Sequence, residues 1–299
     1  MEKEIAFIDW LNNNGSSVSP KIQFSAFEEG RGIIAEDNIE QDEELFYIGL
    51  ECCICPEIDD ESDSMSWLSI IIALHQQFQH DSSFFEPYLS LMSQIDCPLV
   101  WSSFEQTLVE KISAIGKDKS AALFMEVNKH VSCTLEEFNF YACLVMAYSF
   151  TFGDNIMMVP MADMLNHHSS HNAQLYEVED GFIMRAIKPI AAGQQVFNTY
   201  GDYSNIDLLI KYGFIEPNNP YEMDWLDSCF GLFTAVDEVY VEEQWEEKNG
   251  YDPRLEVEAY MVDLDLILDV VETNDRIIKL QYIAQTHKEL LLEWLEQAK

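Results

Sequence analysis

The sequence predicts an α+β protein in which a helical insertion interrupts one β-rich domain. Short stretches of alternating apolar and polar residues, typical of strands, occur before residue 56 and return after residue 155. The residues between them, and those from residue 255 on, instead show the spacing of amphipathic helices, whereas a turn region with Pro and Asn lies beyond Pro217. We therefore expect four segments: an N-terminal part of the β-rich domain, the helical insertion, the C-terminal part of that domain and a short helical C-terminal region, at residues 1–55, 56–155, 156–217 and 218–299.

The two parts of the β-rich domain carry the expected strands. The first part opens with a short amphipathic helix at residues 5–11, which ends at an Asn-Asn-Asn-Gly break. A glycine turn, Glu-Glu-Gly-Arg-Gly, joins the first two strands into a hairpin. Strands are expected at residues 22–27, 32–35 and 45–48, and in the second part at 156–159, 172–178, 182–187 and 195–197.

Helices are expected in the insertion, after the last strand and in the C-terminal region. Thr134 at the N-cap and Glu137 at the N3 position form a capping box in front of one of them. The polar pair Ser204-Asn205 opens another, which is short. The longer helices are expected at residues 67–79, 104–115, 119–130, 138–150, 255–271 and 277–298.

The charge of the chain restricts its partners. There are 54 acidic and 16 basic residues, which gives a formal net charge of −38. This charge opposes contacts with phosphates and with an anionic membrane surface, so we expect neither nucleic acid nor membrane as a partner. It attracts basic partners such as Lys-rich proteins. The alternative, that the acidity serves only solubility, stays open.

The seven cysteines predict free thiols in a reducing compartment, because their number is odd and residues 1–15 lack a signal-peptide pattern. We expect a soluble protein, cytoplasmic and/or nuclear, and a monomer. The longest mainly apolar stretch, residues 67–74, is far shorter than the ~20 residues that span a bilayer. Cys52, Cys53 and Cys55 have no second Cys/His pair at zinc-ribbon spacing, which favours a structural role.

Two polar groups of residues could bind a ligand. Gly30-Arg31-Gly32 would let the backbone approach a ligand closely, although a lone Gly-x-Gly more often marks a turn. Three histidines and an aspartate between residues 163 and 171 suggest a metal site, but their spacing differs from His-Glu-x-x-His, so we expect no metal. Asn166 and His167 offer donors and acceptors for a purine edge or a ribose, or else form a polar helix cap.

Two Tyr-Gly pairs, at Tyr200 and Tyr212, flank the short helix. A tyrosine between a strand end and a tight turn presents its hydroxyl at an edge, and the alternative is that both rings pack in a small core. The sequence contains no Gly-x-Ser-x-Gly and no cysteine in a recognisable catalytic context. An enzyme built on these residues would use a tyrosine hydroxyl, backbone carbonyls and positioning.

Five motifs occur in order: Glu-Gly-Arg-Gly-Ile-Ile-Ala at residues 29–35, Pro-Tyr-Leu-x-x-Met at 87–92, Met-Ala-Tyr-Ser-Phe at 146–150, Val-Pro-Met-Ala-Asp-Met-Leu-Asn-His at 159–167, and Phe-Asn-Thr-Tyr-Gly…Tyr-Gly-Phe at 197–214. Together they resemble the SET-domain protein methyltransferases, in the branch of the Rubisco large-subunit methyltransferase and the fungal ribosomal-protein lysine methyltransferases. The resemblance runs from about Gly30 to Pro217. It implies a fold of small curved β-sheets, in which the segment after Asn166 threads beneath a loop.

The resemblance also implies S-adenosyl-L-methionine as cofactor and a role for individual residues. Tyr200 matches the catalytic tyrosine of the family. Cofactor contacts are implied for Glu29, Gly30, Arg31, Gly32, Asn166, His167, Tyr200, Tyr212 and Phe214. Substrate contacts are implied for Ser149, Phe150, Asp163, Tyr176 and Tyr212.

The activity that the resemblance implies is protein-lysine N-methylation of a basic, non-histone protein such as a ribosomal protein. No cysteine cluster follows Tyr212, whereas histone-tail SET enzymes carry a zinc-binding segment there. Two alternatives stay open: a protein-histidine methyltransferase with the same fold and cofactor, and a non-catalytic module that binds basic proteins. Residues 218–299 are expected to resemble a substrate-binding region.

Overall fold

The computed structural model describes residues 2–27, 30–56, 65–113, 120–153, 155–230, 232 and 253–297. The chain forms two compact units. Unit 1 consists of Met1–Ile95 and Lys119–Gly201, and unit 2 of Asp96–Asp118 and Asp202–Lys299. A part of the helical insertion therefore belongs to the same unit as the C-terminal region.

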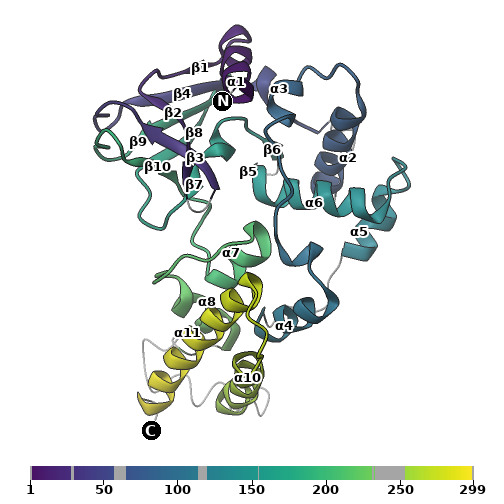
Figure 1. Cartoon of the computed structure of the whole chain (residues 1–299), viewed down its shortest axis with the longest axis vertical. Coiled ribbons are helices and arrows are strands. Elements are labelled where there is room, and N and C mark those ends of the chain that lie inside the picture. Colours follow the sequence, from purple (N-terminus) through teal and green to yellow (C-terminus); the bar gives the residue numbers. More distant parts are fainter. Residues whose placement is uncertain are drawn as a thin grey trace. The chain divides into compact units, whose positions relative to one another are not determined.

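Two four-stranded sheets and a strand pair form the β-structure of unit 1 (Figure 1). The first sheet has the order β1-β4-β9-β8, the second β2-β3-β10-β7, and β5 pairs with β6. Strands β7 and β10 are parallel, and the other pairs are antiparallel. The bounds are β1 Ser17–Val18, β2 Ile22–Phe27, β3 Gly30–Ala35, β4 Glu44–Gly49, β5 Ser149–Phe152, β6 Asn155–Met158, β7 Asn166–His167, β8 Ala173–Val178, β9 Gly181–Ala186 and β10 Gln195–Asn198.

All the strands expected from the sequence are present. They could be predicted because alternating apolar and polar residues indicate a strand with one buried face. Inward-facing side chains such as Ile33, Ile48 and Phe182 are fully buried, at 0% exposure. The helices of unit 1 are α1 Glu2–Asn13, η1 Leu50–Cys52, α2 Met65–Gln79, α3 Glu86–Leu89, α5 Ser120–Val127, α6 Leu135–Tyr148 and η3 Ala162–Met164.

The capping box in front of α6 is confirmed: the Glu137 amide donates to Thr134 Oγ1 at 3.2 Å, and Glu137 Oε2 accepts from the Thr134 amide at 2.7 Å. The prediction for the end of this helix was wrong. The helix ends at Tyr148, and Ser149 and Phe150 belong to β5, where they pair with β6. Pairing with the strand that follows directly in the chain, β6, thus overrides the local helical pattern.

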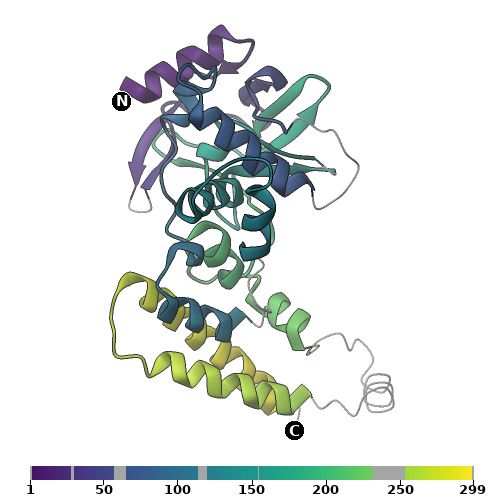
Figure 2. The same ribbon diagram turned by 90° about the vertical axis from the view of Figure 1, so that its right-hand side faces the viewer.

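Unit 2 is helical. Its elements are η2 Pro98–Val100, α4 Ser103–Ser113, α7 Asn205–Tyr212, α8 Glu222–Phe230, α10 Pro253–Leu268 and α11 Asp275–Gln297. Helices α10 and α11 pack against each other and against α4 (Figure 2). Leu264 of α10 and Leu280 of α11 are completely buried in the common core of these helices, together with Leu209 of α7. Helix α8 lies where the sequence indicated only turns.

Candidate functional site

Gly32 in β3 is the centre of the candidate site in unit 1. The strand register pairs Gln195 of β10 with Ile34 of β3, and Phe197 of β10 with Asn166 of β7. Because residues two apart on a strand share a face, Gly32 lies on the same face of the sheet as Gln195 and Asn166. A Cβ at residue 32 would lie 2.7 Å from Asn166 Nδ2 and 2.7 Å from Gln195 Nε2. A side chain at position 32 would therefore require both amides to shift from the positions that they have beside glycine.

The amide nitrogens of Asn166 and Gln195 are buried and have no hydrogen-bond partner among the residues that the structure describes. A buried donor without a partner costs roughly 1–3 kcal/mol, so native proteins keep few of them. Two such donors, side by side over one glycine, are the arrangement expected where a polar ligand supplies the acceptors. Gln195 was not among the residues singled out from the sequence, although its place two residues before Phe197 on β10 puts both on one face.

Tyr200 follows the end of β10 and is anchored to the segment around β7. Its amide donates to His167 Nδ1 at 3.0 Å, which makes this imidazole a neutral acceptor at Nδ1. Its hydroxyl donates to the Leu165 carbonyl at 2.9 Å. The rings of Tyr200 and His167 are tilted with centroids 5.2 Å apart. The structure thus brings together Tyr200, His167 and the neighbouring Asn166.

The side chains of Arg31 and Asp163 are directed into a polar cluster of unit 1 that also contains Tyr88. The Arg31 guanidinium donates to the Leu91 carbonyl at 2.9 Å and contacts Met164 Sδ at 2.9 Å. The Tyr88 hydroxyl donates to Asp163 Oδ2, and both residues are buried. Burial raises the pKa of Asp163 to about 7, against the opposing effects of the Tyr88 hydrogen bond and the Arg31 charge.

This cluster joins three of the sequence motifs at η3, immediately before Asn166. Tyr88 and Leu91 come from the Pro-Tyr-Leu motif, Arg31 from the glycine hairpin, and Asp163 from the motif that ends in Asn166-His167. Sequence reasoning identified the motifs but not this contact, because their separation in the sequence conceals it.

The remaining unit 1 residues of the expected site are spread over other elements. Ser149 and Phe150 lie in β5, opposite Met158 and Met157. Tyr176 lies on the edge strand β8 and is 45% exposed. Gly30 has a φ of 119°, a conformation that favours glycine. Glu29 lies outside the described residues.

Unit 2 carries the other two expected residues, Tyr212 and Phe214. Tyr212 ends α7, and Gly213 caps the helix in the left-handed conformation with a φ of 80°. The Tyr212 ring lies 6.2 Å from the Phe214 ring and 6.3 Å from the Tyr203 ring, measured between centroids. Burial raises the pKa of Tyr212, so its hydroxyl stays protonated.

A hollow of about 390 Å³ lies beside β10 in unit 1. Gln195 and Phe197 contribute to its wall, so this face of β10 is accessible. The other lining residues are mostly polar: His168, Ser170, Asn172, Lys188, Pro189 and Gln194.

Within the described part of the chain, no group of three or more His, Cys, Asp or Glu side chains is placed to hold a metal ion. None of the helices in that part is both long enough and apolar enough to cross a membrane. All seven cysteines are free thiols.

Comparison with known proteins identifies the class. The SET-domain family model matches residues 30–201, and the chain belongs to this family. The structure is similar to that of the SET domain of the Rubisco large-subunit methyltransferase with lysine and S-adenosylhomocysteine, with a TM-score of 0.71 and 17% identity over 98% of this chain and 90% of that chain. A second structure, Rubisco LSMT bound to sinefungin and monomethyllysine, gives a TM-score of 0.70 at 15% identity, covering 100% and 92% of the two chains. The predicted SET-domain fold is confirmed.

Sequence relatives belong to one group within the family. The N-lysine methyltransferase setd6 of Xenopus tropicalis is 31% identical over 260 residues, which cover 71% of this chain and 57% of that protein. The N-lysine methyltransferase SETD6 of Rattus norvegicus is 30% identical over 254 residues, 71% of this chain and 54% of that protein. The chain thus spans little more than half the length of these relatives.

Proposed function

We propose that this chain is an S-adenosyl-L-methionine-dependent protein-lysine N-methyltransferase. The observation that carries the proposal is the meeting of Gly32, Asn166 and the Tyr200–His167 pair in unit 1. Relatives that bear the name N-lysine methyltransferase, and neighbouring structures that hold lysine or methyllysine with the cofactor product or an analogue, support it.

The residues of unit 1 fit such a cofactor. Gly32 lets the amides of Asn166 and Gln195 lie close to the backbone, and both amides are buried donors without a hydrogen-bond partner among the residues that the structure describes. We assign the binding of the cofactor to the backbone at Gly30, Arg31 and Gly32, to Asn166 and His167, and to Tyr200, Tyr212 and Phe214. When bound, the cofactor supplies a methyl group on a positively charged sulfonium, and transfer is an in-line displacement.

The protein must present a neutral amine in line with that methyl group. Free lysine has a pKa of about 10.4. Burial among aromatic side chains disfavours the charged ammonium and lowers this pKa. The Tyr200 hydroxyl donates its proton to the Leu165 carbonyl, so its oxygen keeps lone pairs that can accept a hydrogen bond from the amine. We assign orientation of the amine to Tyr200, and substrate contacts to Ser149, Phe150, Asp163, Tyr176 and Tyr212.

The proposed substrate is a basic, non-histone protein, for which a ribosomal protein is one example. The net charge of −38 favours encounter with a Lys-rich protein and opposes nucleic acid. We propose that the protein acts as a monomer in the cytoplasm, the nucleus or both.

The test is to incubate the protein with methyl-labelled S-adenosylmethionine and a whole-cell extract, and to identify the labelled residue by mass spectrometry. The proposal expects the label on lysine of a basic protein. A label on histidine would contradict the proposed lysine methylation and would identify the protein as a histidine methyltransferase. No label at all, together with no cofactor binding, would favour a binding module without catalysis.

A further inference from the structure

The segment Tyr212-Gly213-Phe214 in unit 2 is held by a close backbone contact. A Cβ at Gly213 would lie 2.4 Å from the Asp96 carbonyl oxygen and 2.9 Å from its carbon. The Gly213 amide donates to Leu209 O at 3.0 Å as the cap of α7. The backbone at Asp96 therefore packs directly onto the residue between Tyr212 and Phe214.

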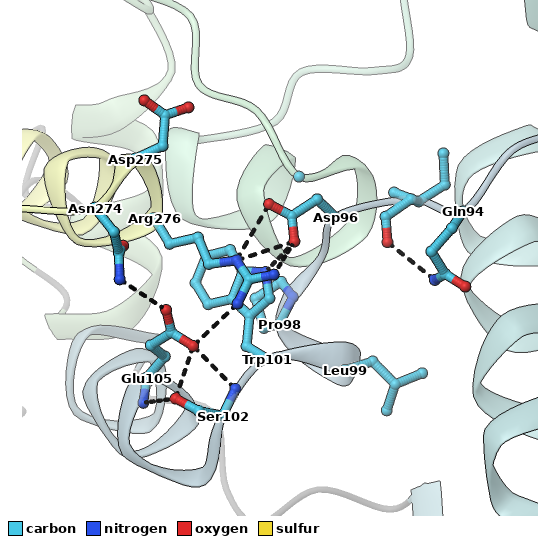
Figure 3. A network of polar contacts seen from close by, with 12 residues as sticks. Gln94, Asp96, Pro98, Leu99, Trp101, Ser102, Glu105, Asn274, Asp275 and Arg276 are labelled. Carbon is cyan, nitrogen blue, oxygen red and sulfur yellow. Dashed lines mark hydrogen bonds and ion pairs between the residues drawn. The ribbon is translucent and has the colours of Figure 1, made fainter.

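The side chain of Asp96 is fixed in turn by α11. Arg276 donates three hydrogen bonds to its carboxylate: Nη2 to Oδ1 at 2.7 Å, Nε to Oδ1 at 3.0 Å and Nε to Oδ2 at 3.2 Å. The indole of Trp101 donates to the same Oδ1 at 3.0 Å. Figure 3 shows the guanidinium of Arg276 between the carboxylates of Asp96 and Glu105. A forked arginine–carboxylate contact of this kind fixes both groups in direction as well as distance.

Arg276 is itself held by its other neighbours. Its Nη1 donates to Glu105 Oε2 at 3.1 Å, and its guanidinium carbon lies 5.4 Å from the centroid of the Trp101 ring. Glu105 is 5% exposed. Its second oxygen accepts from Asn274 Nδ2 at 3.2 Å, and Asn274 Oδ1 accepts from the Ile277 amide in the first turn of α11. The network connects the start of α11 to the start of α4 and to Asp96.

Lys279, one turn further along α11, reaches the same segment directly. Its Nζ donates to the Gly213 carbonyl at 3.0 Å. Two side chains of α11 thus hold Gly213, one through Asp96 and the other by direct contact. The carbonyl of Gly213 is the group that links it to Phe214.

We propose that Arg276 and Lys279 are positioning residues for Tyr212 and Phe214. On this view the C-terminal helix contributes to cofactor binding and methyl transfer by fixing the aromatic segment, apart from any contact that it makes with substrate. The inference rests on the proposed function for the role of Tyr212 and Phe214, and on contacts within unit 2 for everything else.

The test compares Arg276→Gln and Lys279→Met with the matched control Lys288→Met. Lys288 lies on the same helix and forms an ion pair with Asp265, without a contact to Asp96 or Gly213. The first readout is amide hydrogen exchange in a peptide covering residues 205–216. Because a charge-assisted hydrogen bond is lost in each case, we expect exchange in this peptide to rise roughly tenfold in both variants and to stay unchanged in the control.

The second readout is the dissociation constant of S-adenosylmethionine by calorimetry, which we expect to rise roughly fivefold to tenfold in both variants and not in the control. Arg276→Lys keeps the charge but cannot form the forked contact, so it should show a smaller change in the same direction. It replaces Arg276→Gln in the test if that variant does not fold. Unchanged exchange and unchanged affinity in both variants would overturn the inference. If the wild-type protein binds no cofactor, the proposed function fails, and the exchange experiment still decides whether α11 holds the segment.

Discussion

The polar side chains that surround Gly32 differ from those that surround Gly213. At Gly32, in unit 1, Asn166 and Gln195 present buried donors without a described partner. At Gly213, in unit 2, Arg276, Lys279 and their acceptors are bonded to one another and to the backbone. In both places glycine permits a close approach. The first arrangement leaves hydrogen-bonding capacity for a ligand, whereas the second uses its capacity to hold the chain in place.

Tyr200→Phe tests the catalytic part of unit 1 and has the largest expected effect. The variant loses the hydroxyl that would orient the amine but keeps the ring beside His167. We expect kcat for methyl transfer to fall about 10³-fold, within the range for a group acting directly on the reacting atoms, while the cofactor still binds because the ring of residue 200 is kept. Equal kcat values for the variant and the wild type would refute the role of Tyr200.

Asp163→Asn tests whether the buried carboxyl group of Asp163, in η3, holds its proton to an unusually high pH in the folded protein. Because the pKa of about 7 in the folded protein lies above the ordinary value of 3.8, the folded state holds a proton that the unfolded state has released between these pH values. The contribution of this group to the free energy of unfolding of the wild type therefore falls as pH rises from about 4 to about 7, by about 4 kcal/mol, and is constant above pH 7.

The free energy of unfolding of Asp163→Asn should therefore increase relative to that of the wild type as pH rises from about 4 to about 7. Chemical denaturation at several pH values measures it. The control Glu44→Gln, which removes an exposed ion pair with Arg185, should show no such trend. A flat difference for Asp163→Asn would mean that the carboxyl group titrates normally.

Gly32→Ala sharpens the contrast between the two glycines. The added Cβ would collide with the amides of Asn166 and Gln195, which must move. We expect the cofactor dissociation constant to rise roughly thirtyfold, about 2 kcal/mol, since overpacking of a filled site costs 1–3 kcal/mol. Gly193→Ala is the control, since no atom lies within 4 Å of the position of its added Cβ. Because the φ of Gly193 is 84°, we expect this variant to lose stability but to keep the affinity for the cofactor. Affinity retained in Gly32→Ala would exclude a ligand site over this residue.

Much of the fold could be predicted from the sequence because the local signals are strong. Alternation identified the strands, and Thr134 with Glu137 identified the start of α6. The polar residue Ser204 caps α7 as expected, accepting from the Asp207 amide. These features depend on residues close together in the chain, so the sequence displays them directly.

The contacts that give the site its character could not be predicted in the same way. Each of these contacts joins parts of the chain that are far apart in the sequence: Gln195 with Gly32, Tyr88 with Asp163, and Arg276 with Asp96. Helical periodicity predicted a helix at residues 104–115, where the structure has α4 at Ser103–Ser113, but it did not predict that α4 shares a core with α10 and α11. Motif order located the candidate residues, whereas strand register and side-chain partners were needed to say which of them face a ligand.

The most direct test of the ligand site in unit 1 is calorimetric titration of S-adenosylmethionine into Asn166→Ala, with the thermal stability of the free protein measured alongside. The variant removes a buried donor that has no hydrogen-bond partner among the residues that the structure describes, so the loss of this donor should not lower the thermal stability of the free protein. The dissociation constant of S-adenosylmethionine should rise about tenfold. An unchanged dissociation constant would contradict the account.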